Sequence, residues 1–108
     1  MMDLQLACAW LQRDTVGLSD IEDFAVRCLN ASRTATRESA ALLLLAQTAQ
    51  TFSERQSGIA ASGETFHAFL TSTRTQATRL RDAAATSDAD FLAALNAFAA
   101  QLTTEVYA

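Results

Sequence analysis

Apolar residues recur along the chain at the three- and four-residue spacing of amphipathic helices, and polar connections divide them into five segments. The longest apolar run, Ala40 to Ala46, lies inside a segment without glycine or proline that spans residues 35–57. A helix that is apolar on all sides must be covered on more than one side. We therefore expect residues 35–57 to form the central helix, with the other helices packed around its first half.

Two more long helices are predicted after the central one, over residues 64–85 and 88–106. Because the three long helices are joined by short loops, they should pack antiparallel. The stripes expected to face the core are Leu42, Leu45, Ala46, Ala49, Phe52 and Ile59; then Phe66, Phe69, Leu70, Thr73, Ala77, Leu80 and Ala84; then Phe91, Leu95, Phe98 and Leu102.

Two shorter helices are predicted at the N-terminus, over residues 3–13 and 20–31. Each has one clear apolar stripe. The stripes are Leu4, Ala7, Cys8 and Leu11 in the first helix, and Ile21, Phe24, Ala25, Cys28 and Leu29 in the second. The first helix also has a second apolar face, so it should be wedged between other elements or should meet a partner.

Several residues have the identity and position of helix caps. Ser19 with Glu22 three residues later, and Ser87 with Asp90, have the spacing of a capping box. Gly58 is suited to the left-handed conformation that ends many helices. These positions predict where the second and fifth helices begin and where the central helix ends.

Composition supports an all-α chain. The 108 residues include 23 alanines, three glycines and no proline, and β-branched residues other than threonine are scarce. A chain of this length forms one domain, here residues 1–108. The sequence therefore predicts a compact bundle of four to five helices. Eight arginines without a lysine, together with the abundant alanine, are typical of a GC-rich bacterial genome.

The charge excludes some partners. A net charge of −4 is opposite to that of a general nucleic-acid binder, whose affinity comes largely from neutralising phosphates. The N-terminal apolar run is short and lacks a cationic flank, and no segment has the length of a membrane span. We therefore expect a cytoplasmic protein without a nucleic-acid or membrane partner.

No pattern for catalysis is present. The chain lacks a glycine-rich phosphate loop followed by Lys-Ser or Lys-Thr, a Gly-x-Ser-x-Gly elbow and a Glu-x-x-His pair. Cys8 and Cys28 lie on predicted buried stripes and have no Cys-x-x-Cys spacing, so we expect buried thiols that act as small apolar side chains. We predict a protein that is not an enzyme, with no catalytic, cofactor-binding or metal-binding residues.

A polar edge of the predicted 64–85 helix could bind an acidic partner or accept a phosphate. His67, Arg74 and Arg81 are seven residues apart on one side of the predicted 64–85 helix, where an acidic partner could bind. In size and architecture the bundle is similar to the phosphotransfer domains of bacterial relays, which would make His67 a phosphate acceptor. That family has a lysine and a glycine just after the histidine, whereas His67 is followed by Ala-Phe-Leu-Thr.

Four apolar residues lie off the main stripes: Leu6, Trp10, Leu43 and Leu44. Apolar surface that the chain does not cover itself usually marks an interface, and twofold dimers are the commonest arrangement. We therefore expect a protein–protein interaction module, an adaptor, regulator or chaperone-like protein that binds a protein partner or forms a homodimer. In size and charge it resembles bacterial adaptors and secretion chaperones. A second alternative is a binder of small apolar ligands between the three long helices.

Overall fold

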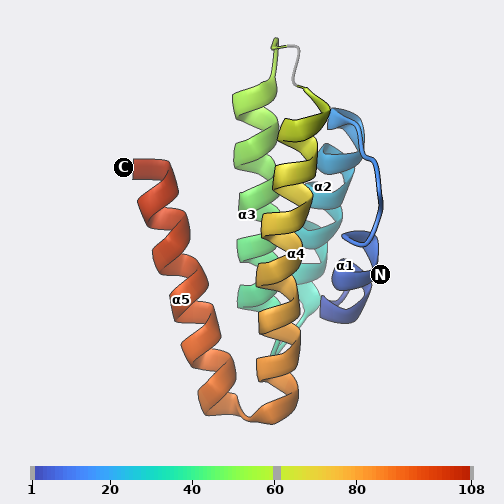
Figure 1. Ribbon diagram of the computed structural model, residues 1–108. Helices are drawn as coiled ribbons and strands as arrows, with labels where there is room; N and C mark the ends of the chain where they lie inside the picture. Colours follow the sequence, from blue (N-terminus) through green and yellow to red (C-terminus); the bar gives the residue numbers. More distant parts are fainter. Residues whose placement is uncertain (1, 60–61, 108) are drawn as a thin grey trace.

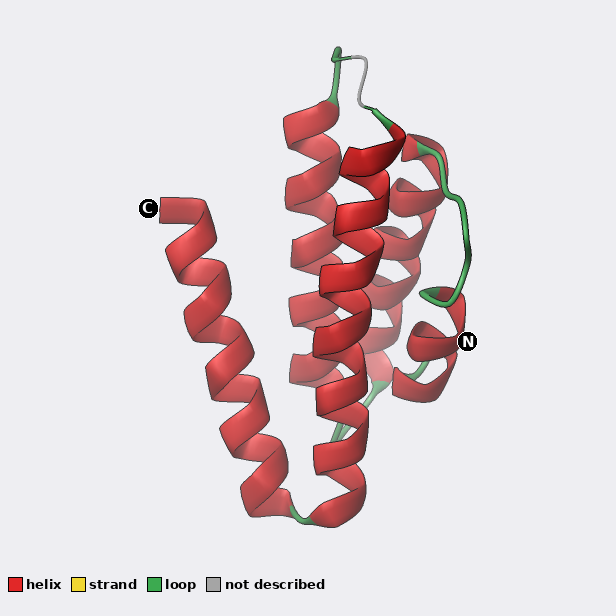
Figure 2. Ribbon diagram, in the orientation of Figure 1, coloured by secondary structure: helices red, strands yellow, loops and turns green. Residues whose placement is uncertain are grey.

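The computed structural model describes residues 2–59 and 62–107, and the side chains of these residues up to Thr104. The described residues form α-helices joined by short loops, and none of them lies in a strand (Figures 1 and 2). The helices are α1 (Leu4–Trp10), α2 (Leu18–Thr34), α3 (Ser39–Gln56), α4 (Gly63–Thr86) and α5 (Asp88–Tyr107). The predicted all-α bundle is confirmed.

The helices are arranged around α3 and α4 (Figure 1). Helix α2 packs along α3, while α4 contacts α3 and also α1 and α5. Consecutive long helices run antiparallel, as predicted, so α3 and α5 run in the same direction. From its start beside the end of α4, α5 diverges from α3 toward its C-terminal end.

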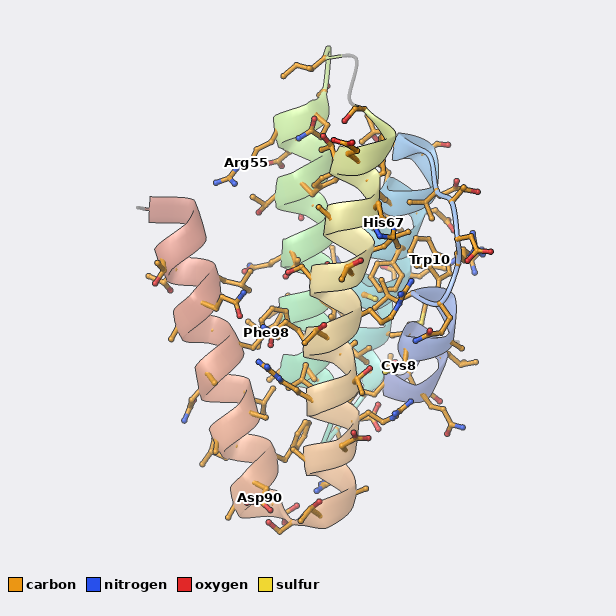
Figure 3. The ribbon with its side chains drawn as sticks, in the orientation of Figure 1. Cys8, Trp10, Arg55, His67, Asp90 and Phe98 are labelled. Carbon is orange, nitrogen blue, oxygen red and sulfur yellow. The ribbon has the colours of Figure 1, made fainter. Side chains whose placement is uncertain are left out.

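The predicted apolar stripes form the core. The fully buried large side chains come from α1 to α4 and include Leu4, Phe24, Leu42, Leu70 and Leu80. Phe91 and Phe98 of α5 are also buried, and Phe98 points from α5 toward the other helices (Figure 3). The prediction for Ile59 is wrong, because this side chain follows the end of α3 and is 63% exposed.

The first half of α3 is covered less completely than its sequence predicts. Leu42 and Leu45 are buried, but Leu44 is half-buried and Leu43 is 40% exposed. Helix α3 also begins at Ser39 rather than at residue 35. The reason is that α2 extends to Thr34, and Ala35 then adopts an extended conformation that separates the two helices.

The structure confirms two of the three predicted helix caps, those at Gly58 and Ser87. Gly58 has a φ of 77° just after α3, and the Ser87 hydroxyl accepts a hydrogen bond of 3.0 Å from the Asp90 backbone N–H at the start of α5. Ser19 is not the N-cap of α2, which is Gly17, whose N–H donates to the Asp20 carboxylate.

Helix α1 is too short to be stable alone, so its position depends on tertiary contacts. At its start, the Leu4 N–H donates to Glu38 Oε1 at 2.8 Å, and Asp3 caps the first turn by accepting from the Leu6 N–H. At its end, Arg74 of α4 donates from Nε to the Leu11 carbonyl at 2.9 Å. These contacts hold α1 against α4 and the start of α3.

Within the described residues, no helix combines the length and the apolar character that crossing a membrane requires.

Candidate functional site

A groove lies between α1 and α2 and contains two of the residues that the sequence singles out, Leu6 and Trp10. Its volume is about 780 Å³, which is within the range of roughly 300–1,000 Å³ typical of ligand sites. We call it the α1–α2 groove. Its lining residues are Met2, Leu6, Ala9, Trp10, Arg13, Arg27, Asn30, Ala31 and Thr34.

The floor of the α1–α2 groove is built on an aromatic stack. The rings of Trp10 and Phe24 are stacked with their centroids 4.4 Å apart, and the Phe24 side chain is fully buried. Trp10 lies off the main stripe of α1, as predicted, but it is only 8% exposed, because the chain itself covers most of its side chain. Leu6, one turn earlier on α1, is 50% exposed and forms an apolar wall.

The two ends of the α1–α2 groove differ in charge. The Leu4–Glu38 hydrogen bond places the start of α1 at the loop that joins the end of α2 to α3, while Trp10 contacts Phe24 in the first half of α2. Arg13 and Arg27 therefore lie together at one end of the groove, and Met2 and Leu6 lie toward the other.

The two arginines are held in different ways. The Arg13 guanidinium lies 4.7 Å from the centre of the Trp10 ring, as a cation–π contact. Arg27 forms a 2.8 Å ion pair with Asp23, one turn earlier on α2. Asp23 does not line the groove, and none of the lining residues is acidic. Arg13 is thus the cation whose charge is least compensated at this end.

The second pair of predicted residues, Leu43 and Leu44, lies at another surface. A groove of about 500 Å³ separates α3 from the diverging α5, and we call it the α3–α5 groove. Its lining residues are Leu44, Gln47, Gln50, Thr51, Glu54, Ala99, Leu102 and Thr103. Leu43 continues the row of Gln47, Gln50 and Glu54 along the outer edge of α3.

A further hollow of about 430 Å³ lies between α3, α4 and α5, where the sequence placed a pocket for a small apolar ligand. Phe52 and Phe69 face it, with their ring centroids 4.5 Å apart, and Leu102 closes it on the α5 side. Threonine, glutamine and arginine side chains make up much of the remaining lining. Binding of a small apolar ligand here stays a prediction.

The predicted polar edge of α4 is partly used within the chain. Arg74 is half-buried and binds the carbonyl oxygens of Leu11 and Arg13, which end α1 without helical partners. Arg81 pairs with its neighbour Asp82 at 3.2 Å. His67 is exposed on the second turn of α4 (Figure 3). Because Arg74 holds α1, an acidic partner at this edge would have to rely on His67 and Arg81.

The two cysteines are buried, as predicted. Burial raises the pKa of the Cys28 thiol to about 12, and burial is also the largest cause of the raised pKa of Cys8. Both thiols therefore stay protonated and unreactive near neutral pH. Among the described residues, no group of three or more His, Cys, Asp or Glu side chains is arranged to hold a metal ion.

Sequence reasoning did not assign Arg13 and Arg27 to the site. Arg13 could have been found, since it follows Leu6 and Trp10 at helical spacing and so continues their row on α1. Arg27 could not, because its place in the groove depends on how α1 lies against α2.

Comparison of the chain with protein-family models, with curated proteins and with solved structures gives no match.

Proposed function

We propose that this protein is a non-catalytic interaction module whose α1–α2 groove binds an amphipathic helix of a protein partner. The observation that carries the proposal is the combination of an exposed apolar wall, Leu6, with an aromatic floor, Trp10, and a cation, Arg13, at one end. Helix-in-groove recognition uses this arrangement, in which apolar residues anchor the helix and charges at the rim fix its direction.

The charge pattern indicates the chemistry of the partner. Because the lining contains two arginines and no carboxylate, a bound helix should carry an acidic residue next to its apolar stripe. Asp23 already pairs with Arg27 at 2.8 Å, so the partner's carboxylate should lie against Arg13. Tryptophan and arginine side chains are also the residues that most often dominate binding energy in interfaces.

Trp10 provides the readout for the test, because it is the only tryptophan in the chain. The probe is a tryptophan-free 18-residue amphipathic peptide, with leucines at helical spacing and glutamates beside them. We expect saturable changes in Trp10 fluorescence, and at least a tenfold weaker affinity for Leu6→Glu, which corresponds to a loss of about 1.4 kcal/mol.

The matched control is Val26→Glu, which adds the same charge to an α2 side chain that is 55% exposed and does not line the groove. Equal loss of affinity in both variants would contradict the proposed site, since it would reflect net charge alone. If dodecanoate binds and the peptide does not, the ligand of the groove is a small amphipathic anion and not a helix of a protein partner.

A further inference from the structure

Two long stretches of this chain carry no charged side chain, and both border the α3–α5 groove. Residues 39–53 include most of α3, and residues 91–104 include most of α5. All twenty charged side chains of the chain lie outside these two stretches. The α3–α5 surface is therefore unlike the rest of the molecule, in which about one residue in four is charged.

Two rows of side chains form the edges of this neutral surface. On α3 the row is Leu43, Gln47, Gln50 and Glu54, and on α5 it is Leu92, Asn96, Ala99 and Thr103, with the same spacing of four, three and four residues. Five of these eight residues line the α3–α5 groove. At the other end of each row stands an exposed leucine, since Leu43 is 40% and Leu92 is 59% exposed.

Side-chain contacts fix the start of α5, which lies several turns before the α5 residues that line the α3–α5 groove. Arg37 donates to Asp88 from Nε and from its terminal nitrogen, at 2.9 and 2.7 Å, and also to the Ala84 carbonyl at 2.9 Å. Its guanidinium also lies 5.1 Å from the centre of the Phe91 ring. Farther along, Gln76 of α4 donates a hydrogen bond to Gln101 of α5.

We infer that this neutral α3–α5 surface binds a second copy of the chain, with α3 and α5 of each copy forming a four-helix bundle around a twofold axis. Two copies that each carry a net charge of −4 repel one another, so they can pack closely only where the surface carries little charge. Apart from the end that carries Glu54, the surface has no charge of either sign that would repel an identical surface, as a twofold contact requires. A different protein would instead be selected by complementary charges, and the described residues of this surface carry charge only at one end, where Glu54 is followed by Arg55 (Figure 3).

The twofold arrangement places the α5 helices antiparallel. Leu92 of one copy would then lie toward Thr103 of the other, and Asn96 would lie near the axis. The small side chains Ala93, Ala97 and Ala100 on the adjoining face of α5 let two helix backbones approach closely. This surface is separate from the α1–α2 groove, so the inference does not depend on the proposed binding of an amphipathic helix.

The test is the molar mass in solution, measured by light scattering over a concentration series. We expect the wild type to reach twice 11.6 kDa and Leu92→Glu to remain at 11.6 kDa with an unchanged circular dichroism spectrum. Val26→Glu, with a similarly exposed apolar side chain on α2, should dimerise like the wild type. A wild type that stays monomeric at every concentration, a dimeric Leu92→Glu, or a monomeric Val26→Glu would each overturn the inference.

A cross-linking experiment tests the arrangement itself. Cys8 and Cys28 are buried, so an exposed cysteine introduced by Asn96→Cys would be the reactive thiol. Mild oxidation should convert most of this variant to a disulfide-linked dimer, whereas Ser19→Cys on α2 should stay uncoupled. A dimeric Asn96→Cys that does not cross-link, or equal cross-linking of both variants, would overturn the antiparallel arrangement.

Discussion

Trp10 and Phe24 stack with their ring centroids 4.4 Å apart and their planes at 29°, which joins the shortest helix of the fold to α2. The same stack forms the floor of the α1–α2 groove. Trp10 stacks on Phe24, and the Arg13 guanidinium lies over the Trp10 ring. Stability and the proposed binding surface thus share one side chain.

Trp10→Ala should lower the free energy of unfolding by about 3 kcal/mol, because truncating a buried tryptophan removes apolar burial and leaves a cavity. Trp10→Phe, which keeps an aromatic ring on Phe24, should cost no more than about half as much. Urea unfolding followed by circular dichroism measures both values. A loss below 1 kcal/mol for Trp10→Ala would mean that the stack does not hold α1 in place.

Arg74→Ala should destabilise the fold by about 1–2 kcal/mol, because the carbonyl oxygens of Leu11 and Arg13 lose their charged donor. Arg74→Lys should recover little of this, since an ammonium lacks the planar fork that spans two carbonyls. Hydrogen exchange should become faster in α1 before other helices respond. The control is Arg79→Ala, an exposed arginine of the same helix, which should change stability by no more than about 0.5 kcal/mol.

Alkaline pH should destabilise the protein through Cys28. Its pKa is raised to about 12 in the fold from an ordinary value of 9.0, so between these pH values the unfolded chain releases a proton that the folded chain keeps. The unfolded state then binds fewer protons, and stability falls as the pH rises through this window, by up to about 1.4 kcal/mol per pH unit. Cys28→Ala should show a shallower decline above pH 9 in urea titrations. Identical slopes for the variant and the wild type would contradict the assignment.

Arg37→Ala should loosen the start of α5. The Arg37–Asp88 pair is largely exposed, with side-chain exposures of 47% and 91%, so its loss should cost about 1 kcal/mol or less. The effect should shrink in 1 M salt, where exposed ion pairs are screened. Hydrogen exchange of the first two turns of α5 provides the local readout. A uniform increase in exchange over all helices would show instead that Arg37 supports the whole bundle.

Much of the fold could be predicted from the sequence because each helix carries its own periodic stripe. The stripes of α1, α2 and α4 are buried almost residue by residue, from Leu4 to Leu80. Helix ends were harder to predict, because several nearby polar side chains compete to cap the same backbone N–H groups. Glu22 could have completed a capping box with Ser19, but it accepts a hydrogen bond from Ser53 of α3 while Asp20 caps Gly17.

The candidate site could be predicted only in part. Leu6 and Leu43 were correctly recognised as off the buried stripes, since they are 50% and 40% exposed. The role of Arg74 could not be foreseen, because it depends on α1 lying against α4, 63 residues away along the chain. The periodicity of single helices predicts which faces are buried, but it does not say which helix covers which face.

The most direct test of the proposed function is a charge exchange at Arg13, followed by nuclear magnetic resonance. The amphipathic glutamate peptide should shift the amide signals of α1 and the second half of α2 in the wild type. Arg13→Glu should weaken that binding at least tenfold, and a version of the peptide with lysine opposite residue 13 should restore it. The α1–α2 groove is not the partner site if the peptide shifts signals elsewhere. The same holds if Arg13→Glu still binds the glutamate peptide more tightly than the lysine version.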